Sequence, residues 1–218
     1  MALLRPLLLA AALTACATAR WEPTGDQAQP DAGTTTQVDA PRQTGSADAS
    51  MSGGCTQAFT GTLASWSFAT ETGTQPSTPV TTKAPGVTAG PIERAPALTP
   101  VSGANAMNSS NWPLTTQPDP TKNYKLTIAP PSGCTLSITG LAIDAKASAT
   151  GPTMAAVTTS VDSYGQQTAI STALASTPAL SIPAQTAMIE LRVSGYGANA
   201  TTGTLRLQGT FTLTGSLQ

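Results

Sequence analysis

The chain of 218 residues contains no histidine. Without an imidazole group, it has neither the general base of Ser-His-Asp and Cys-His catalysis nor the commonest protein ligand of transition metals. The sequence also lacks a CxxC pair, a phosphate-binding P-loop and a dinucleotide-binding glycine fingerprint. These absences argue against the serine and cysteine hydrolases and against nucleotide-dependent enzymes.

Charged side chains are scarce, at 10% of the residues, and the formal net charge is −1. This balance indicates no basic surface, so we expect no nucleic-acid partner. Glu190 alternates with Arg192 on a strand side that faces solvent, and Asp144 and Asp162 are expected at strand ends. The carboxylates of residues 55–218 are few, and all are in this set: Glu71, Glu93, Asp119, Asp144, Asp162 and Glu190.

We expect these carboxylates to be solvated or to cap turns, with no catalytic residue, no cofactor and no metal. One alternative is a structural calcium ion among Asp119, Asp144 and Asp162, since calcium prefers clustered oxygen ligands. Another is a small envelope hydrolase that uses two carboxylates across a cleft.

No apolar run reaches the length of about 20 residues that a membrane-spanning helix needs. The N-terminus instead has Arg5, an apolar run over residues 7–13 and small residues around Cys16, which is the plan of an export signal. The export signal ends in Leu13-Thr14-Ala15-Cys16 (LTAC), which resembles the lipobox of bacterial lipoproteins. The resemblance implies that residues 1–15 are removed and that Cys16 carries a diacylglycerol and an N-acyl chain, with membrane lipid as its partner.

The alternative is an ordinary secretory signal that is cut after Ala17 or Ala19. The residue after Cys16 is alanine rather than the aspartate of an inner-membrane retention signal, which favours the outer membrane of a bacterial cell envelope. Residues 17–54 have no apolar periodicity and are rich in Pro, Gly, Thr, Gln, Asp and Ala. We therefore expect residues 16–54 to be a disordered tether that begins at the lipidated cysteine.

Residues 55–218 show the two-residue alternation of β-strands. In residues 202–215, Leu205, Leu207, Phe211 and Leu213 share one side. The alternation of residues 134–145 changes phase at Gly140, which predicts a β-bulge. Further strands are expected at 58–70, 86–95, 124–129, 153–163, 166–172 and 188–197. About eight strands predict an all-β fold, an antiparallel two-sheet sandwich with jelly-roll topology.

Several pieces occur in a familiar order: Trp112, Asp119-Pro120, residues 122–152, SVDSYG at 160–165 and residues 189–215. In this order they resemble a β-sandwich domain of bacterial surface and secreted proteins, often of the PEP-CTERM type. The resemblance covers roughly residues 58–216 and implies a jelly-roll-like fold on an exported protein, without any catalytic residue. Cys134 departs from it, because that position is usually aromatic or apolar in such domains.

Two cysteines, Cys55 and Cys134, remain in the domain. Because an exported chain meets an oxidising compartment, we expect them to form a disulfide, and two free thiols are the alternative. Three aromatic residues are candidate ligand contacts: Trp112 in an Asn/Ser/Pro loop, and Tyr164 and Tyr196 beside glycines at strand ends. They suit stacking on a sugar, whereas the alternative is that they pack and close one end of the sandwich.

These features favour a non-catalytic lipoprotein of the cell envelope, with a structural, adhesive or recognition role. Its partner would be an extracellular glycan or an envelope protein. The alternatives are a carbohydrate-binding module that uses loop aromatics and the small hydrolase named above.

Overall fold

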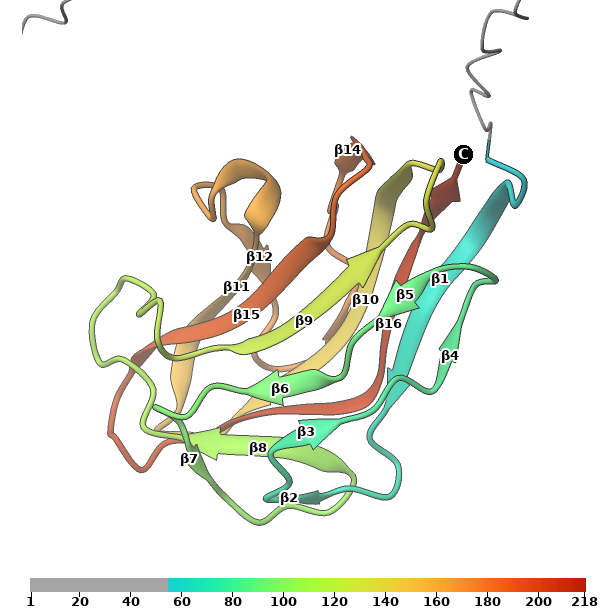
Figure 1. Cartoon of the computed structure of the whole chain (residues 1–218). Helices are drawn as coiled ribbons and strands as arrows, with labels where there is room; N and C mark the ends of the chain where they lie inside the picture. The colour runs from blue at the N-terminus through green and yellow to red at the C-terminus, as the bar shows by residue number, and fades with distance from the viewer. Residues whose placement is uncertain (1–54) are drawn as a thin grey trace, which may run out of the picture. The chain divides into compact units, whose positions relative to one another are not determined.

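The computed structural model describes residues 55–218, which form two β-sheets that lie face to face (Figure 1). The predictions for the signal peptide, for lipidated Cys16 and for the tether concern residues 1–54 and lie outside the described residues. Within the described part, no helix has the length and hydrophobicity that crossing a membrane requires.

The larger sheet has nine strands within residues 55–218. Three long strands in the order β10-β16-β1 make its centre: Leu136–Ala147, Leu205–Leu217 and Phe59–Ser67. Strand β8 (Ala106–Ser110) also pairs with β16. Shorter strands complete this sheet: β2 (Thr72–Gly73), β4 (Thr82–Lys83), β7 (Thr99–Pro100), β13 (Ala175–Ser176) and β14 (Ile182–Gln185).

The smaller sheet has seven strands in the same part of the chain, and its centre is the order β11-β15-β9. These strands are Pro152–Thr159, Ile189–Ala198 and Tyr124–Ala129. The short strands are β3 (Ser77–Thr78), β5 (Thr88–Ala89), β6 (Ile92–Arg94) and β12 (Thr168–Ile170). A single 3-10 turn, η1 (Ser160–Asp162), follows β11 within the described residues.

These two sheets confirm the prediction of an all-β, two-sheet sandwich. The pairings of the long strands are antiparallel, and the two-residue contact between β2 and β8 is parallel. The count of about eight strands corresponds to the seven strands of five or more residues in the described part. The other nine have two to four residues, which is too short for an alternation to be recognised.

The core lies between the sheets and is made by one side of each long strand. The four apolar residues predicted to point inward on β16, from Leu205 to Leu213, are at most 1% exposed. Trp66 on β1 packs edge to face on Phe211, with ring centres 5.6 Å apart. Each such side chain contributes roughly 1.5–3 kcal/mol when it is fully buried, so this layer holds the sheets together.

The register between β10 and β16 shifts between Ile138 and Gly140, which confirms the predicted bulge. A second shift lies between Ala142 and Asp144, opposite Gly209, whose φ is +63°. Asp144 therefore lies inside β10 and not at a strand end, and it accepts a 3.0 Å hydrogen bond from the side chain of Gln208. The prediction for Asp144 was wrong because the two bulges let the strand continue to Ala147.

Polar links also join the sheets through the core. Trp66 Nε1 donates to the carbonyl of Gly90, between β5 and β6, at 2.9 Å. The hydroxyl of Tyr124 on β9 donates to the carbonyl of Leu205 on β16 at 2.8 Å. The guanidinium of Arg94 on β6 reaches side-chain and backbone oxygens of β8. These bonds satisfy polar groups that would otherwise be buried without a partner, and they set how one sheet lies on the other.

The predicted disulfide between Cys55 and Cys134 is present and joins residues 79 positions apart in the sequence. Cys55 precedes β1 and Cys134 precedes β10, the two strands that flank β16. The first residues of both strands pair with Leu217 near the C-terminus. The disulfide therefore joins the two neighbours of β16 at the end of the sheet where the chain finishes (Figure 1).

Candidate functional site

Two hollows flank residues 158–168, the segment that runs from the end of β11 through η1 into β12. Adjacent residues of this segment line different hollows. Thr159 and Gln166 line the first, and their neighbours Thr158 and Gln167 line the second. The segment is therefore a wall that the two hollows share.

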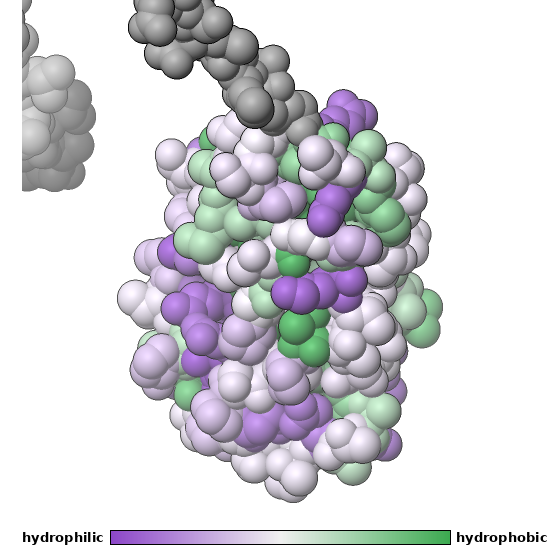
Figure 2. Space-filling model, turned by 45° about the vertical axis from the view of Figure 1, so that its right-hand side comes forward, coloured by the Kyte–Doolittle hydropathy of each residue, from purple (hydrophilic) through white to green (hydrophobic). Residues whose placement is uncertain are grey.

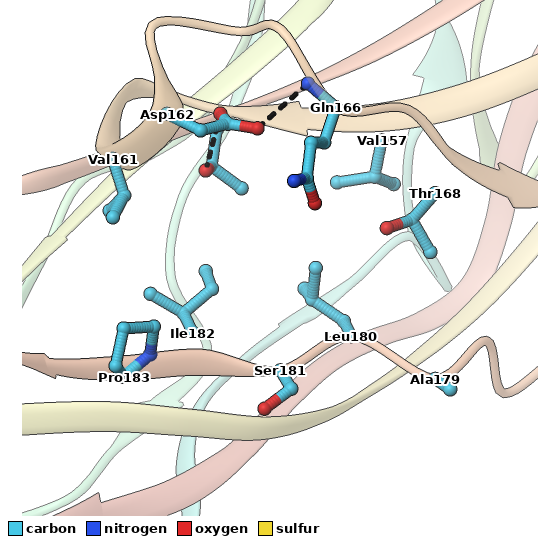
Figure 3. A pocket seen from close by; sticks show the side chains of 11 residues that line it. Val157, Val161, Asp162, Gln166, Thr168, Ala179, Leu180, Ser181, Ile182 and Pro183 are labelled. Carbon is cyan, nitrogen blue, oxygen red and sulfur yellow. Dashed lines mark hydrogen bonds between the residues drawn. The ribbon is translucent and has the colours of Figure 1, made fainter.

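The edge hollow has a volume of about 410 Å³ and opens between the margins of the two sheets. Figure 3 shows residues of β11 and β12 on one side and residues 179–183, which lead into β14, on the other. Val157, Leu180 and Ile182 are buried apolar residues of its lining. The full lining is Val157, Thr159, Val161, Asp162, Gln166, Thr168, Ala179, Leu180, Ser181, Ile182 and Pro183.

The carboxylate of Asp162 organises the turn beside the edge hollow. One of its oxygens accepts a hydrogen bond from Thr159 Oγ1 at 3.3 Å, and the other accepts one from the backbone N–H of Gln166 at 2.7 Å (Figure 3). Both carboxylate oxygens thus hold the wall segment in place, which is the turn role that short acidic side chains commonly play.

The outer hollow has a volume of about 200 Å³ and lies over the side of β15 that faces away from the core. Glu190, Arg192 and Ser194 alternate on that side with the buried core residues of the same strand. The lining is Gln117, Pro118, Pro120, Thr158, Tyr164, Gln167, Arg192 and Ser194.

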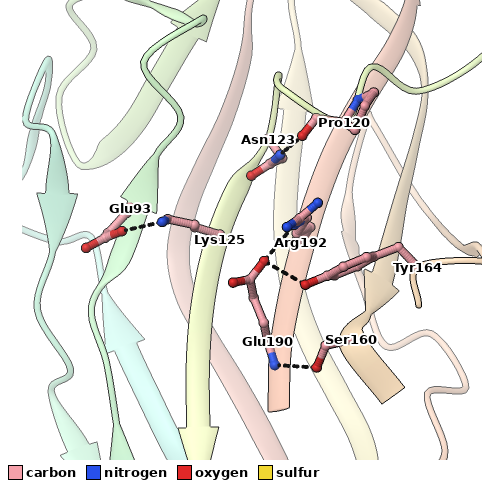
Figure 4. Close-up of polar contacts among 8 residues, drawn as sticks. All are labelled: Glu93, Pro120, Asn123, Lys125, Ser160, Tyr164, Glu190 and Arg192. Atoms are coloured by element: carbon pink, nitrogen blue, oxygen red, sulfur yellow. Dashed lines mark hydrogen bonds and ion pairs between the residues drawn. The ribbon is translucent and has the colours of Figure 1, made fainter. Parts of the chain in front are cut away.

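Tyr164, Glu190 and Arg192 form a compact polar cluster at the outer hollow (Figure 4). Arg192 Nε donates to Glu190 Oε1 at 2.6 Å, and the Tyr164 hydroxyl donates to the same oxygen at 2.9 Å. The guanidinium carbon of Arg192 lies 3.8 Å from the centre of the Tyr164 ring. Such a cation–π contact contributes about 0.5–1 kcal/mol at an exposed site. The three side chains therefore hold one another in a single arrangement.

The contacts within the cluster also shift the pKa values of Glu190 and Tyr164. Partial burial raises the pKa of Glu190, but the hydrogen bonds from Arg192 and Tyr164 outweigh it, so the net pKa lies below its ordinary value. Burial and the bond to Glu190 raise the pKa of Tyr164. At neutral pH the cluster thus contains a carboxylate, a guanidinium and a neutral phenol.

The backbone beneath Tyr164 is unusual. Ser163 and Tyr164 have φ values of +56° and +63°, in the left-handed region that favours glycine. The N–H of Tyr164 donates to the carbonyl of Thr159 at 2.8 Å, which holds the turn closed. Gly165, which would adopt this conformation without cost, is the next residue.

The charged row continues across the smaller sheet from β15 to β6 (Figure 4). Lys125 on β9 stands opposite Arg192 on one side and opposite Glu93 on the other, and its Nζ lies 3.1 Å from Glu93 Oε2. Each cation in this row has a carboxylate partner, so the row as a whole is electrically neutral.

The structure separates the three aromatic candidates. Tyr164 lines the outer hollow, and the hydroxyl of Tyr196 donates to Gln167 Oε1 at 3.2 Å, so both lie at the same side of β15. Trp112, by contrast, is 0% exposed, and its Nε1 donates to the carbonyl of Ser109 at 2.8 Å. The prediction of Trp112 as a ligand contact was wrong, because the ring packs edge to face on Tyr124 in the core.

Arg192, Gln167 and the prolines of residues 117–120 are not among the site residues predicted from the sequence. The signal that pointed to Arg192 was its alternation with Glu190 on the solvent side of a strand. Nothing local in the sequence indicates that residues 117–120 and 164–167 lie around the same side chains, since only the fold brings them together.

The alternative of a calcium ion among Asp119, Asp144 and Asp162 has no support from the structure. Within residues 55–218, no three His, Cys, Asp or Glu side chains lie close enough together to hold a metal ion. The face drawn in Figure 2 is dominated by neutral and weakly polar residues, with hydrophobic ones in scattered spots. This face therefore offers no broad apolar patch of the kind that marks many protein interfaces.

Comparisons of the chain with models of protein families, with curated proteins and with solved structures found no match. The resemblance to domains of PEP-CTERM-type proteins stays a prediction that rests on the order of the sequence pieces.

Proposed function

We propose that the protein is an exported lipoprotein of the bacterial cell envelope, held by acyl chains on Cys16, whose β-sandwich is a non-catalytic recognition module. The observation that carries this proposal is the Cys55–Cys134 disulfide. Disulfides persist in oxidising compartments and are rare in the cytosol, so the cross-link and the LTAC export signal point to the same location.

The position of the disulfide also suits a domain displayed on a tether. Cys55 lies just before β1, and the disulfide ties it to the turn before β10 in the larger sheet. A domain at a cell surface must keep its first strand in place while the preceding chain is pulled or cleaved. A covalent link at this point meets that requirement.

Recognition is favoured over catalysis because the two carboxylates at the hollows, Glu190 and Asp162, are held by ion pairing and hydrogen bonds. A general acid or base works best with a pKa near the operating pH. Glu190 has a lowered pKa and is paired with Arg192, while both oxygens of Asp162 accept hydrogen bonds from the turn. These interactions stabilise the local structure around the hollows and engage the carboxylates that proton transfer would require.

One observation favours the hydrolase alternative. Glu93 and Glu190 both line a small hollow of about 120 Å³ over β9 and β15. Lys125 lies in the same hollow and pairs with Glu93, and Arg192 pairs with Glu190. Each carboxylate is held by its own cation, which argues against the free pair of carboxyl groups that glycoside hydrolysis uses.

The anchoring part of the proposal is tested in a Gram-negative host that expresses the full chain. We expect the mature protein to fractionate with membranes and to carry the mass of the acyl groups on Cys16. The Cys16→Ala variant is expected to lose both properties. Wild-type mature protein without acyl groups would contradict the proposal.

The non-catalytic part is tested by screening the purified chain on esters, peptides and glycosides. We expect no turnover, and Glu93→Gln and Glu190→Gln variants serve to identify the source of any activity. Hydrolysis that either substitution abolishes, with circular dichroism unchanged, would support the hydrolase instead.

A further inference from the structure

We propose that the outer hollow binds a neutral sugar ring, a pyranose unit of an extracellular glycan. This inference rests on the proposed recognition function and names the ligand class of its site. Three properties of the hollow carry it: its free hydrogen-bonding groups, its charge balance and its apolar walls.

The hydrogen-bonding groups suit hydroxyl ligands. The ion pair of Arg192 uses Nε, and among the described residues its two terminal amino groups have no protein acceptor. The Gln167 carbonyl accepts from Tyr196, which leaves the amide NH₂ of Gln167 free of recorded protein partners in the same part of the chain. Thr158 and Ser194 add hydroxyl groups to the lining. A sugar hydroxyl donates and accepts at once, so it matches this mixture of donors and hydroxyls.

The charge balance selects a neutral ligand. An anionic group would need an unpaired cation, because a carboxylate or phosphate is recognised by a free guanidinium fork. Here Glu190 already neutralises Arg192 at 2.6 Å, and Lys125 is paired with Glu93. The guanidinium therefore contributes directed donors without an excess of positive charge.

The walls suit the C–H face of a ring. The hollow is bounded by the phenol of Tyr164 and by Pro118 and Pro120 from the loop before β9. Aromatic and proline rings supply apolar contact beside the polar groups. The volume of about 200 Å³ lies below that of pockets for drug-sized ligands, so we infer one ring as the occupant.

The backbone strain at Tyr164 fits this role. Residues held in sparsely populated conformations cluster at functional sites, where the fold must position a side chain. Tyrosine occupies a left-handed position next to Gly165, and its side chain lies under the Arg192 guanidinium. The turn thus presents the phenol and the guanidinium as one surface.

The test uses the exported full chain, purified in mild detergent, and methyl glycosides of neutral hexoses and N-acetylhexosamines. Their binding is followed by NMR through the backbone amides of Thr158, Gln167, Arg192 and Ser194. A ligand of this size should bind with a Kd on the order of 1 mM. We expect Arg192→Gln and Tyr164→Ala each to weaken binding roughly tenfold or more, since each removes hydrogen bonds or a ring wall.

Arg206→Gln is the matched control. Arg206 lines a polar hollow of about 200 Å³ on the larger sheet, whose lining contains no aromatic residue. The control variant should bind the sugars as the wild type does. The inference is overturned if no neutral sugar shifts the four amides, if the shifts lie elsewhere, or if glucuronate and galacturonate bind more tightly than the neutral sugars.

The outcome is separable from that of the proposed function. Acyl mass and membrane fractionation do not depend on the outer hollow, so an anchored protein that binds no sugar overturns only this inference. A protein that binds sugar without acylation overturns only the anchoring.

Discussion

Ser163 and Tyr164 show how single residues depart from local preference in this protein. Each adopts a left-handed conformation that costs an L-residue roughly 1–2 kcal/mol. The backbone bonds of the turn, from Tyr164 to Thr159 and from Ser163 to Ser160, hold them there. At Tyr164 this conformation places the side chain against Glu190 and Arg192. The side chain of Ser163, by contrast, is exposed to solvent.

Replacing Ser163 with glycine should therefore stabilise the fold. Glycine relieves the left-handed strain, while its more flexible unfolded chain offsets part of the gain. We expect the Ser163→Gly variant to have a free energy of unfolding about 0.5–1 kcal/mol higher than the wild type, measured by urea denaturation. Ser163→Ala retains the Cβ atom and should stay within about 0.5 kcal/mol of the wild type. A glycine variant less stable than the alanine variant would contradict this.

The ion pair of Glu190 should make stability depend on pH. Its pKa in the folded protein is lowered, with burial opposing and the bonds from Arg192 and Tyr164 producing the shift. Because the pKa is lowered in the folded protein, the pairing contributes its full stabilisation above about pH 4.3, the pKa of a glutamate in the unfolded chain. This stabilisation is lost as the pH falls through the lower pKa of the folded protein.

We therefore expect Glu190→Gln to be less stable than the wild type at pH 7, by up to about 1 kcal/mol for a partly exposed pair. The difference should shrink as the pH is lowered below the unfolded pKa, where the wild-type carboxylate is protonated too. Urea denaturation at a series of pH values measures it. A difference that stays constant down to acid pH would show that the charge of Glu190 has no part in it.

At the scale of elements, the ladder between β10 and β16 depends on glycines with different roles. Gly209 adopts a left-handed conformation at the second bulge, and a Cβ added there would lie 3.7 Å from its nearest neighbour, Asp144 Oδ2. At Gly215 a Cβ would overlap the backbone oxygen of Ser137. One position needs conformational freedom, and the other needs space.

Alanine at these two positions should therefore have unequal effects. We expect Gly215→Ala to cost about 3 kcal/mol, because the strands must move apart to admit a methyl group. Gly209→Ala should cost about 1 kcal/mol, from backbone strain alone. Thermal and urea unfolding of both variants measure the ranking, and a larger loss at Gly209 would contradict the geometry of the ladder.

At the scale of the whole molecule, the Cys55–Cys134 disulfide joins the start of the domain to its middle. It links the two strands, β1 and β10, that lie on either side of the last strand, β16. Cross-linking residues so far apart in sequence removes many conformations from the unfolded chain. The described domain has one such link, so its stability should respond strongly to reduction.

Reduction of this disulfide should lower the free energy of unfolding by about 4–5 kcal/mol in the chain-entropy model. Urea denaturation with and without a phosphine reductant measures the change. A variant with Cys55→Ala and Cys134→Ala is the control, since the reductant should leave its stability unchanged. Exported protein whose two cysteines react with a thiol reagent before reduction would contradict the pairing.

The amino-acid sequence by itself determined the class of fold and the inward face of the long strands. The predicted strand at residues 124–129 coincides with β9, and Gly140 marked the first bulge. This was possible because a strand alternates with a period of two, so burial on one side leaves a mark in the sequence. The pairing of the two domain cysteines was also predicted, from their number and from the expected export to an oxidising compartment.

Tertiary structure alone decided which aromatic residues are buried and what surrounds them. Trp112 stands among polar residues in the sequence and is wholly enclosed, whereas Tyr164 meets Glu190 and Arg192 from a strand that follows much later in the chain. The turn between η1 and β12 puts two residues into a conformation that their identities do not indicate. The physical reason is that burial and side-chain contacts depend on which distant segments pack against a residue, and that information is absent from its sequence neighbours.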